Sequence, residues 1–159
     1  MLVHCGRIND RDIFYCNIDG DLSTIQAFPT VNWMLFAIAD KGQLEILYAF
    51  AEKCLDLGVL YVCGVGEAGS KIDDAFSLVE IDRKLANLKR DLTQDDFEGS
   101  PMTTWHHDFE EGFWFSATVA HHEHEFINKV VVANLTTNSY ETIVKDLICK
   151  IDSSWLPKG

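Results

Sequence analysis

The middle of the chain alternates continuous apolar runs with segments of helical periodicity. Residues 33–39 and 59–63 are uninterrupted apolar runs of strand length, as expected for strands that are covered on both faces of a sheet. Between them, apolar residues over positions 44–55 recur at the i, i+3, i+4, i+7 spacing of one helical face, and Gly58 follows as a left-handed stop. This pattern predicts a strand, a helix and a second strand.

The same alternation continues to the end of the chain. A second helix is predicted from residue 72, with Ser70 and Asp73 at the spacing of a capping box. Strands are predicted at 102–105 and 129–133, and each precedes a helix, the first capped by Asp108 and the second opened by Asn138. Four strand-helix units predict an α/β fold, a three-layer Rossmann-like sandwich with a mostly parallel sheet of four or more strands and helices on both faces.

The first part of the chain is less regular. Residues 2–8 and 13–18 alternate weakly around Asn9-Asp10, which predicts two strands of an N-terminal hairpin. A chain of 159 residues suffices for one core. We therefore expect a single domain over residues 1–159, with 1–31 as N-terminal strands and 32–159 as the repeated units.

Charge and cysteine usage narrow the classes of partner and compartment. The 25 acidic and 13 basic side chains give a net charge of −12, which disfavours binding to nucleic acid or to anionic lipid and favours a basic protein. The apolar run 33–39 is far shorter than the ~20 residues of a membrane helix. Five widely spaced cysteines without a C-x-x-C pair indicate reduced thiols, and hence a cytoplasmic protein.

Polar residues that follow the predicted strands define a candidate ligand site. Ligands of parallel α/β sheets bind outside the carboxyl ends of the strands. The candidate ligand-binding residues at this edge are Asp40, Gly64, Gly66, Glu67, Asp73, His106 and His107.

The glycine run 64–69 reads G-x-G-x-x-G between a strand and a helix, the arrangement by which some α/β proteins bind phosphate groups. Glu67 lies inside the run, Asp73 and Asp74 are expected in the first turn of the helix, and the P-loop lysine is missing. Fixed negative charge opposes phosphate binding. A tight turn is therefore favoured over a phosphate site, and no cofactor is predicted.

Catalytic candidates at the same edge are Cys63 as a nucleophile, His106 as its base and Asp73 as an acid-base group. A cysteine that ends an apolar strand is also a common small core residue. A metal site is not predicted: His122 and His124 can lie on one side of an extended segment, but no fourth ligand is evident, and a solvated loop explains them as well.

Short motifs resemble a known family. The stretch Gly58-x-x-Tyr61-x-Cys63-x-x-Gly66, followed by Asp73-Asp74 and by Thr104-Trp105-His106, is similar to the pattern of a small bacterial Rossmann-like family of unknown function. The similarity covers about half of the chain. It implies a bacterial cytosolic setting and no particular reaction.

Three functions remain open at this point. Residues 91–101 form an acidic loop, expected to be too polar to pack, whose candidate partner-binding residues are Asp91, Asp95, Asp96 and Glu98. This loop and the absence of a complete catalytic set favour a binding protein, for example an immunity- or antitoxin-like inhibitor of a basic protein. The alternatives are an enzyme or ligand sensor that takes a nucleotide or divalent metal at the carboxyl edge, and a subunit that oligomerises through its amphipathic helices.

Overall fold

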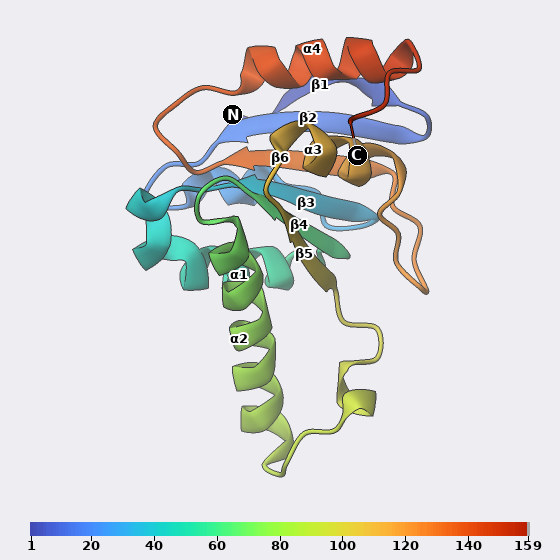
Figure 1. The fold of residues 1–159 in the computed structure, drawn as a ribbon. Coiled ribbons are helices and arrows are strands. Elements are labelled where there is room, and N and C mark those ends of the chain that lie inside the picture. Colours follow the sequence, from blue (N-terminus) through green and yellow to red (C-terminus); the bar gives the residue numbers. More distant parts are fainter. Residues whose placement is uncertain (159) are drawn as a thin grey trace.

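The computed structural model describes residues 1–158, which form a six-stranded sheet with helices packed against it (Figure 1). The strand order is β1-β2-β6-β3-β4-β5. Strand β1 runs antiparallel to β2, and all other neighbours are parallel. The predictions of a mostly parallel α/β sheet and of an N-terminal hairpin are confirmed. The strands are β1 (Val3–Ile8), β2 (Arg11–Asn17), β3 (Trp33–Ile38), β4 (Tyr61–Val65), β5 (Met102–His106) and β6 (Lys129–Asn134).

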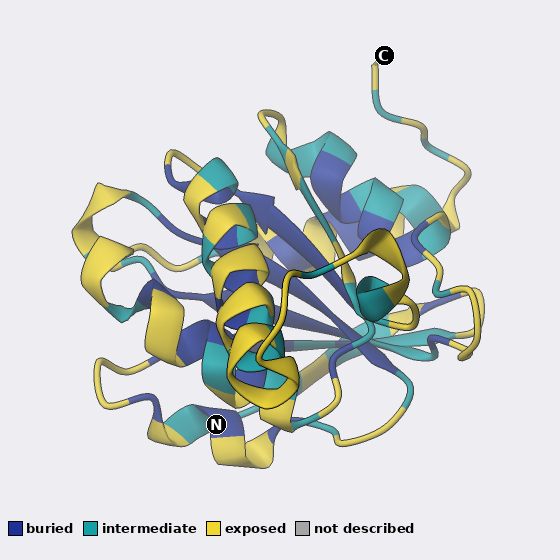
Figure 2. Cartoon of the chain, turned by 90° about the horizontal axis from the view of Figure 1, so that it is seen from below, coloured by how far each residue is buried: buried dark blue, intermediate teal, exposed yellow. Residues whose placement is uncertain are grey.

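The helices bury the two faces of this sheet in separate clusters. Alternate residues of β3 point to opposite sides: Trp33 and Leu35 join a cluster with α1 and α2, whereas Phe36 joins one with α3 and α4. Strands β3 and β4 are therefore buried along their whole length (Figure 2). The α-helices are α1 (Leu47–Asp56), α2 (Gly69–Leu88), α3 (Phe109–Thr118) and α4 (Glu141–Asp152); the 3-10 helices are η1 (Ser23–Ala27), η2 (Lys41–Ile46) and η3 (Gln94–Phe97).

Several expectations about helix starts need correction. The last helix, α4, begins at Glu141 after Tyr140, so Asn138 does not open it. The segment 44–55 is divided into η2 and α1, because the Asp40 side chain accepts a hydrogen bond from the Gly42 N–H at 2.9 Å and opens a 3-10 turn. The capping box predicted at Ser70 and Asp73 is absent from the start of α2. Since α2 already begins at Gly69, its first turn contains no acidic residue, contrary to the expectation for Asp73 and Asp74. The cap at Asp108 is confirmed, with the Glu110 N–H at 2.9 Å.

The acidic segment 91–101 is folded against α2, contrary to the expectation that it is too polar to pack. Asp96 accepts two hydrogen bonds from the Arg90 guanidinium, at 2.8 and 2.9 Å, and one from the Thr93 N–H at 2.8 Å. The ring of Phe97 lies 5.4 Å from Lys84 Nζ on α2. The Ser100 hydroxyl also donates to Glu80 of α2 at 3.3 Å. The ion pair thus shapes the segment, while Phe97 and Ser100 connect it to the helix.

The far half of α2 reaches beyond the sheet together with this segment (Figure 1). Its last buried residue is Val79, and the residues from Glu80 to Leu88 are half-buried or exposed. No helix within residues 1–158 is long and apolar enough to cross a membrane.

Candidate functional site

The carboxyl ends of β3 and β4 bring two predicted site residues near each other. Asp40 follows β3 and Glu67 follows β4, and these strands are neighbours in the sheet. The Lys41 N–H donates to Glu67 Oε1 at 3.4 Å, which ties the two loops together. Asp40 is occupied in capping η2. Both carboxylates thus have backbone partners, and they shape this edge of the sheet.

The glycine run is explained by packing within the protein. A Cβ atom on Gly64 would lie 2.5 Å from the carbonyl oxygen of Gly69, and one on Gly66, whose φ is +92°, would lie 2.5 Å from that of Ala39. The Ala68 N–H also donates to the Ala39 carbonyl at 3.0 Å. The backbone of the turn is therefore pressed against the end of β3 and the start of α2, as a tight turn requires.

Cys63 and His106 lie on the same face of neighbouring strands but have different partners. Cys63 is fully buried, and its thiol lies 3.8 Å from the Gly112 carbonyl, to which it donates. Burial raises the pKa of Cys63 to about 11, so the thiol stays protonated and weakly nucleophilic near neutral pH. His106 Nδ1 lies 3.3 Å from Glu111 Oε1 of α3. The partner of this histidine is thus a glutamate that the sequence reasoning did not select.

The remaining residues of the predicted ligand site are spread apart. Asp73 lies half-buried in the second turn of α2. The His107 ring packs edge-on against Trp105, with 4.7 Å between the ring centroids. None of the predicted ligand residues lines the five pockets described for residues 1–158. The contacts at the carboxyl edge are pairwise: the loop of Asp40 bonds to Glu67, and His106 lies against Glu111.

Asn134, at the end of β6, is the most connected polar residue of this edge. Its side-chain Nδ2 donates to Asn17 Oδ1 at 2.9 Å and to Tyr15 Oη at 3.2 Å, and its side-chain Oδ1 accepts from Thr136 Oγ1 at 2.8 Å. The Tyr15 hydroxyl also accepts from the Tyr140 N–H at 2.9 Å. A buried polar group with all its partners in place stabilises the junction of β2, β6 and α4.

Histidine side chains of the segment that precedes β6 connect this segment to the loop before β5. His122 Nε2 donates to the Gly99 carbonyl at 3.1 Å, and its Nδ1 accepts from the N–H groups of His124 and Glu125 at 3.1 and 3.2 Å. His124 lies 4.0 Å from Glu98. Within residues 1–158, no group of three or more His, Cys, Asp or Glu side chains is placed to hold a metal ion.

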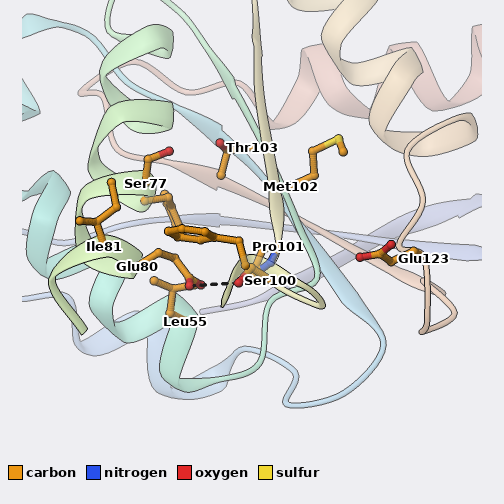
Figure 3. Close-up of a pocket in the computed structure, with 11 residues that line it drawn as sticks. Leu55, Ser77, Glu80, Ile81, Ser100, Pro101, Met102, Thr103 and Glu123 are labelled. Carbon is orange, nitrogen blue, oxygen red and sulfur yellow. Dashed lines mark hydrogen bonds between the residues drawn. The ribbon is translucent and has the colours of Figure 1, made fainter. Parts of the chain in front are cut away.

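Two pockets flank strand β5, near its amino end. The first, of about 400 Å³, lies between α1, α2, the 91–101 segment and β5 (Figure 3). The second, also of about 400 Å³, lies on the α3 side of the same strand. Ser100, Met102 and Glu123 line both. The walls of the first include Phe76, Ile81 and Phe97, and those of the second include Tyr61, Phe115 and Val119.

Charge is distributed very unevenly along the chain. Residues 91–128 contain no Lys or Arg, although the chain has 13 of them. This segment contributes −9 of the net charge of −12. It builds η3, β5, α3 and the loop to β6. Asp108, Glu110 and Glu111 lie at the start of α3, next to the carboxyl end of β5, whereas its other acidic residues lie in the segments 91–98 and 123–125. Its acidic residues are Asp91, Asp95, Asp96, Glu98, Asp108, Glu110, Glu111, Glu123 and Glu125.

A family model described as a domain of unknown function, DUF7684, matches residues 13–151. The chain belongs to the DUF7684 family. No curated protein and no solved structure matches it. The resemblance to a family of unknown function is confirmed to that extent, and the DUF7684 match extends well beyond the motifs that suggested it.

The DUF7684 match includes both the carboxyl edge and the β5 end, from β2 to the last turn of α4. Sequence reasoning found the polar residues of the first region but missed the pockets of the second. A signal for the second existed in the lack of Lys and Arg over residues 91–128. The position of β5 at the edge of the sheet could not be predicted, because the local pattern of apolar and polar residues does not determine strand order.

Proposed function

We propose that this protein is an acidic binding domain that holds a basic protein partner against its β5 end, as an immunity- or antitoxin-like inhibitor does. One observation carries the proposal: −9 of the net charge of −12 comes from residues 91–128, which have no basic residue among them. Lys84 and Arg90 contact this segment, and its exposed carboxylates outnumber them. An excess of negative charge attracts basic partners and raises their rate of association.

The acidic residues of this end divide into two roles. Asp95, Glu98 and Glu125 are exposed and available to a partner. Asp96 is held by Arg90, whose hydrogen bonds keep the pKa of its carboxyl well below the usual range. We therefore infer that Asp96 stabilises the conformation of η3. The exposed carboxylates, together with Asp91, are the proposed partner-binding residues.

Exposed apolar side chains accompany the charge. Met102 and Phe126 are each 61% exposed, and Trp105 is 41% exposed. Protein interfaces combine a few large apolar anchors with a polar rim. The β5 end offers both, which supports a protein partner over a small anion or a nucleic acid.

The test uses basic proteins encoded by the genes beside this one, with affinity measured by calorimetry at several salt concentrations. Tight binding that weakens as salt rises supports the proposal. If no such protein binds, or if affinity is independent of salt, the proposal is wrong.

Two charge variants locate the surface. Replacing Asp95, Glu98 and Glu125 by Asn or Gln should weaken binding by about tenfold or more, since three exposed carboxylates are removed from the interface. The matched control replaces Asp10, Asp19 and Asp146, which are exposed elsewhere, by Asn and changes the net charge equally. Equal loss in both variants would contradict a localised site.

We also propose finer descriptions of architecture and setting. The packing of α1 and α2 on one face and of α3 and α4 on the other supports a three-layer Rossmann-like sandwich. Five free thiols and the motif resemblance support a bacterial cytoplasmic protein.

A second function, an enzyme or ligand sensor for a nucleotide or divalent metal, is favoured by one contact. His106 lies at the carboxyl end of β5 with Glu111 at 3.3 Å, and a carboxylate can orient a histidine for proton transfer. Asp40 and Asp73 would be the other groups of this site, with Cys63 beneath it. Thermal shifts with ATP or Mg²⁺ that disappear in His106→Asn would support this function; shifts that persist in the variant would exclude His106 from it.

A further inference from the structure

Strand β5 is an open edge of the sheet. It pairs with β4 in unbroken register, and no other backbone segment within residues 1–158 bonds to its outer side. The opposite edge, β1, is protected: its register is interrupted between His4 and Gly6, and Ile148 of α4 lies against Gly6. Edge strands are usually blunted by bulges, charges or covering elements. Strand β5 contains no Lys, Arg or Pro, and its Met102 and Trp105 side chains are exposed.

The two pockets lie on opposite faces of this open edge. Thr103 pairs with Val62, which belongs to the cluster under α2, and lines the first pocket. Met102 pairs with Tyr61, which belongs to the cluster under α3 and lines the second pocket, and Met102 itself borders both pockets. In Figure 3, Thr103 points toward α2 and Met102 points to the opposite side of the strand. Consecutive residues of a strand added beside β5 would point alternately into these two pockets.

The chemistry of the pockets indicates the side chains that they accept. The walls of both are mainly apolar and aromatic, whereas Glu123 lines both, with its side chain 63% exposed. Lys and Arg bury their aliphatic stems along apolar surface and keep their charged ends near water. Because Lys84 already lies against the Phe97 ring, a basic side chain would lie along Met102 with its charged end near Glu123. An apolar side chain fits against Phe115 and Val119.

We infer that β5 binds an extended segment of the partner as an added strand, with adjacent side chains in the two pockets. The basic character of the segment rests on the proposed function, whereas the strand geometry rests on the open edge and the paired pockets. Main-chain hydrogen bonds supply affinity in this binding mode, and pockets for alternate side chains supply specificity.

The first experiment uses a library of random twelve-residue peptides displayed on phage and selected on the whole protein. In the peptides that the selection enriches, Lys or Arg is expected to alternate with Val, Ile, Thr or aromatic residues. The best peptide is then synthesised in a series, each member with one N-methyl group on a successive backbone nitrogen. In an added strand, alternate N–H groups bond to β5, so methylation at every second position should weaken binding about five- to tenfold. The intervening positions should leave affinity unchanged.

A variant pair places the peptide on the protein. Met102→Lys puts a positive charge on the edge between the pockets and should weaken binding at least tenfold. Ile143→Lys is the matched control, because Ile143 is also exposed, at 45%, but lies on α4. Thermal unfolding of both variants confirms that they are folded. Equal affinity of the peptide for Met102→Lys and the unchanged protein would overturn the inference.

The outcomes separate this inference from the proposed function. Basic peptides whose binding is insensitive to the position of the N-methyl group would overturn strand addition and leave the proposed function standing. Uncharged peptides with the two-residue pattern would support strand addition and contradict the proposed function. No enrichment over an unrelated protein would overturn the inference.

Discussion

Single residues decide how closely the loops of this fold pack. Gly64 and Gly69 bring the end of β4 against the start of α2, and Gly66 passes the backbone of Ala39. The charges of Glu67 and Asp73 were enough to favour a tight turn over a phosphate site from sequence. The start of α2 could not be predicted from its local capping residues, because the contact between two glycines moves it ahead of Ser70.

Gly64→Ala should lower the free energy of unfolding by about 2–3 kcal/mol, because its Cβ would lie 2.5 Å from a backbone oxygen that cannot move without shifting α2. Gly20→Ala is the control, since no atom lies within 4 Å of the added carbon, and should change stability by less than about 0.5 kcal/mol. Urea unfolding measures both. A stable Gly64→Ala protein would show that the turn has room for a ligand.

At the scale of elements, strands and amphipathic helices were predictable and their order was not. The apolar runs of β3 and β4 predict buried strands, because continuous apolar sequence needs cover on both faces. The return of the chain from β5 to place β6 between β2 and β3 depends on long-range packing. Because strand order could not be predicted, neither the unpaired edge of β5 nor the two pockets beside it could be predicted. Helix η3 was missed because Phe97 alone supplies its apolar contact.

Asp96→Asn should loosen η3 without unfolding the domain, because it removes a charged partner of Arg90 at 2.8 Å and weakens the cap on Thr93. Faster amide exchange at residues 93–98 and faster proteolytic cleavage there are the expected results. Asp95→Asn removes the same charge from a neighbouring exposed residue and should leave exchange unchanged. Similar rates in the two variants would mean that the ion pair does not hold the segment.

The whole molecule should lose stability in alkaline solution. Burial raises the pKa of Cys63 from 9.0 to about 11, so between these values the unfolded chain releases a proton that the folded chain keeps. Stability is unaffected by this group below pH 9 and falls as pH rises from 9 to 11, by roughly 2–3 kcal/mol. Burial also raises the pKa values of Cys16 and Cys54, so Cys63→Ala should reduce this decline without abolishing it, whereas replacement of the exposed Cys149 by Ala should not change it. Equal slopes in urea unfolding of the two variants would contradict this role of Cys63.

In the whole molecule, most of the net negative charge lies in the segments around β5, the strand whose outer side is unpaired within residues 1–158. Net charge was readable from composition, and it favoured a basic partner. Its location required the fold, because η3, β5, α3 and the loop to β6 meet only after the sheet has formed.

The most direct test maps the binding surface by hydrogen-deuterium exchange, with and without a bound basic partner or the selected basic peptide. Protection is expected within residues 91–106 and 119–126, with little change at Asp40 or Glu67. Protection confined to the carboxyl edge, or to surfaces away from β5, would contradict the central claim that this family member binds basic partners at its β5 end.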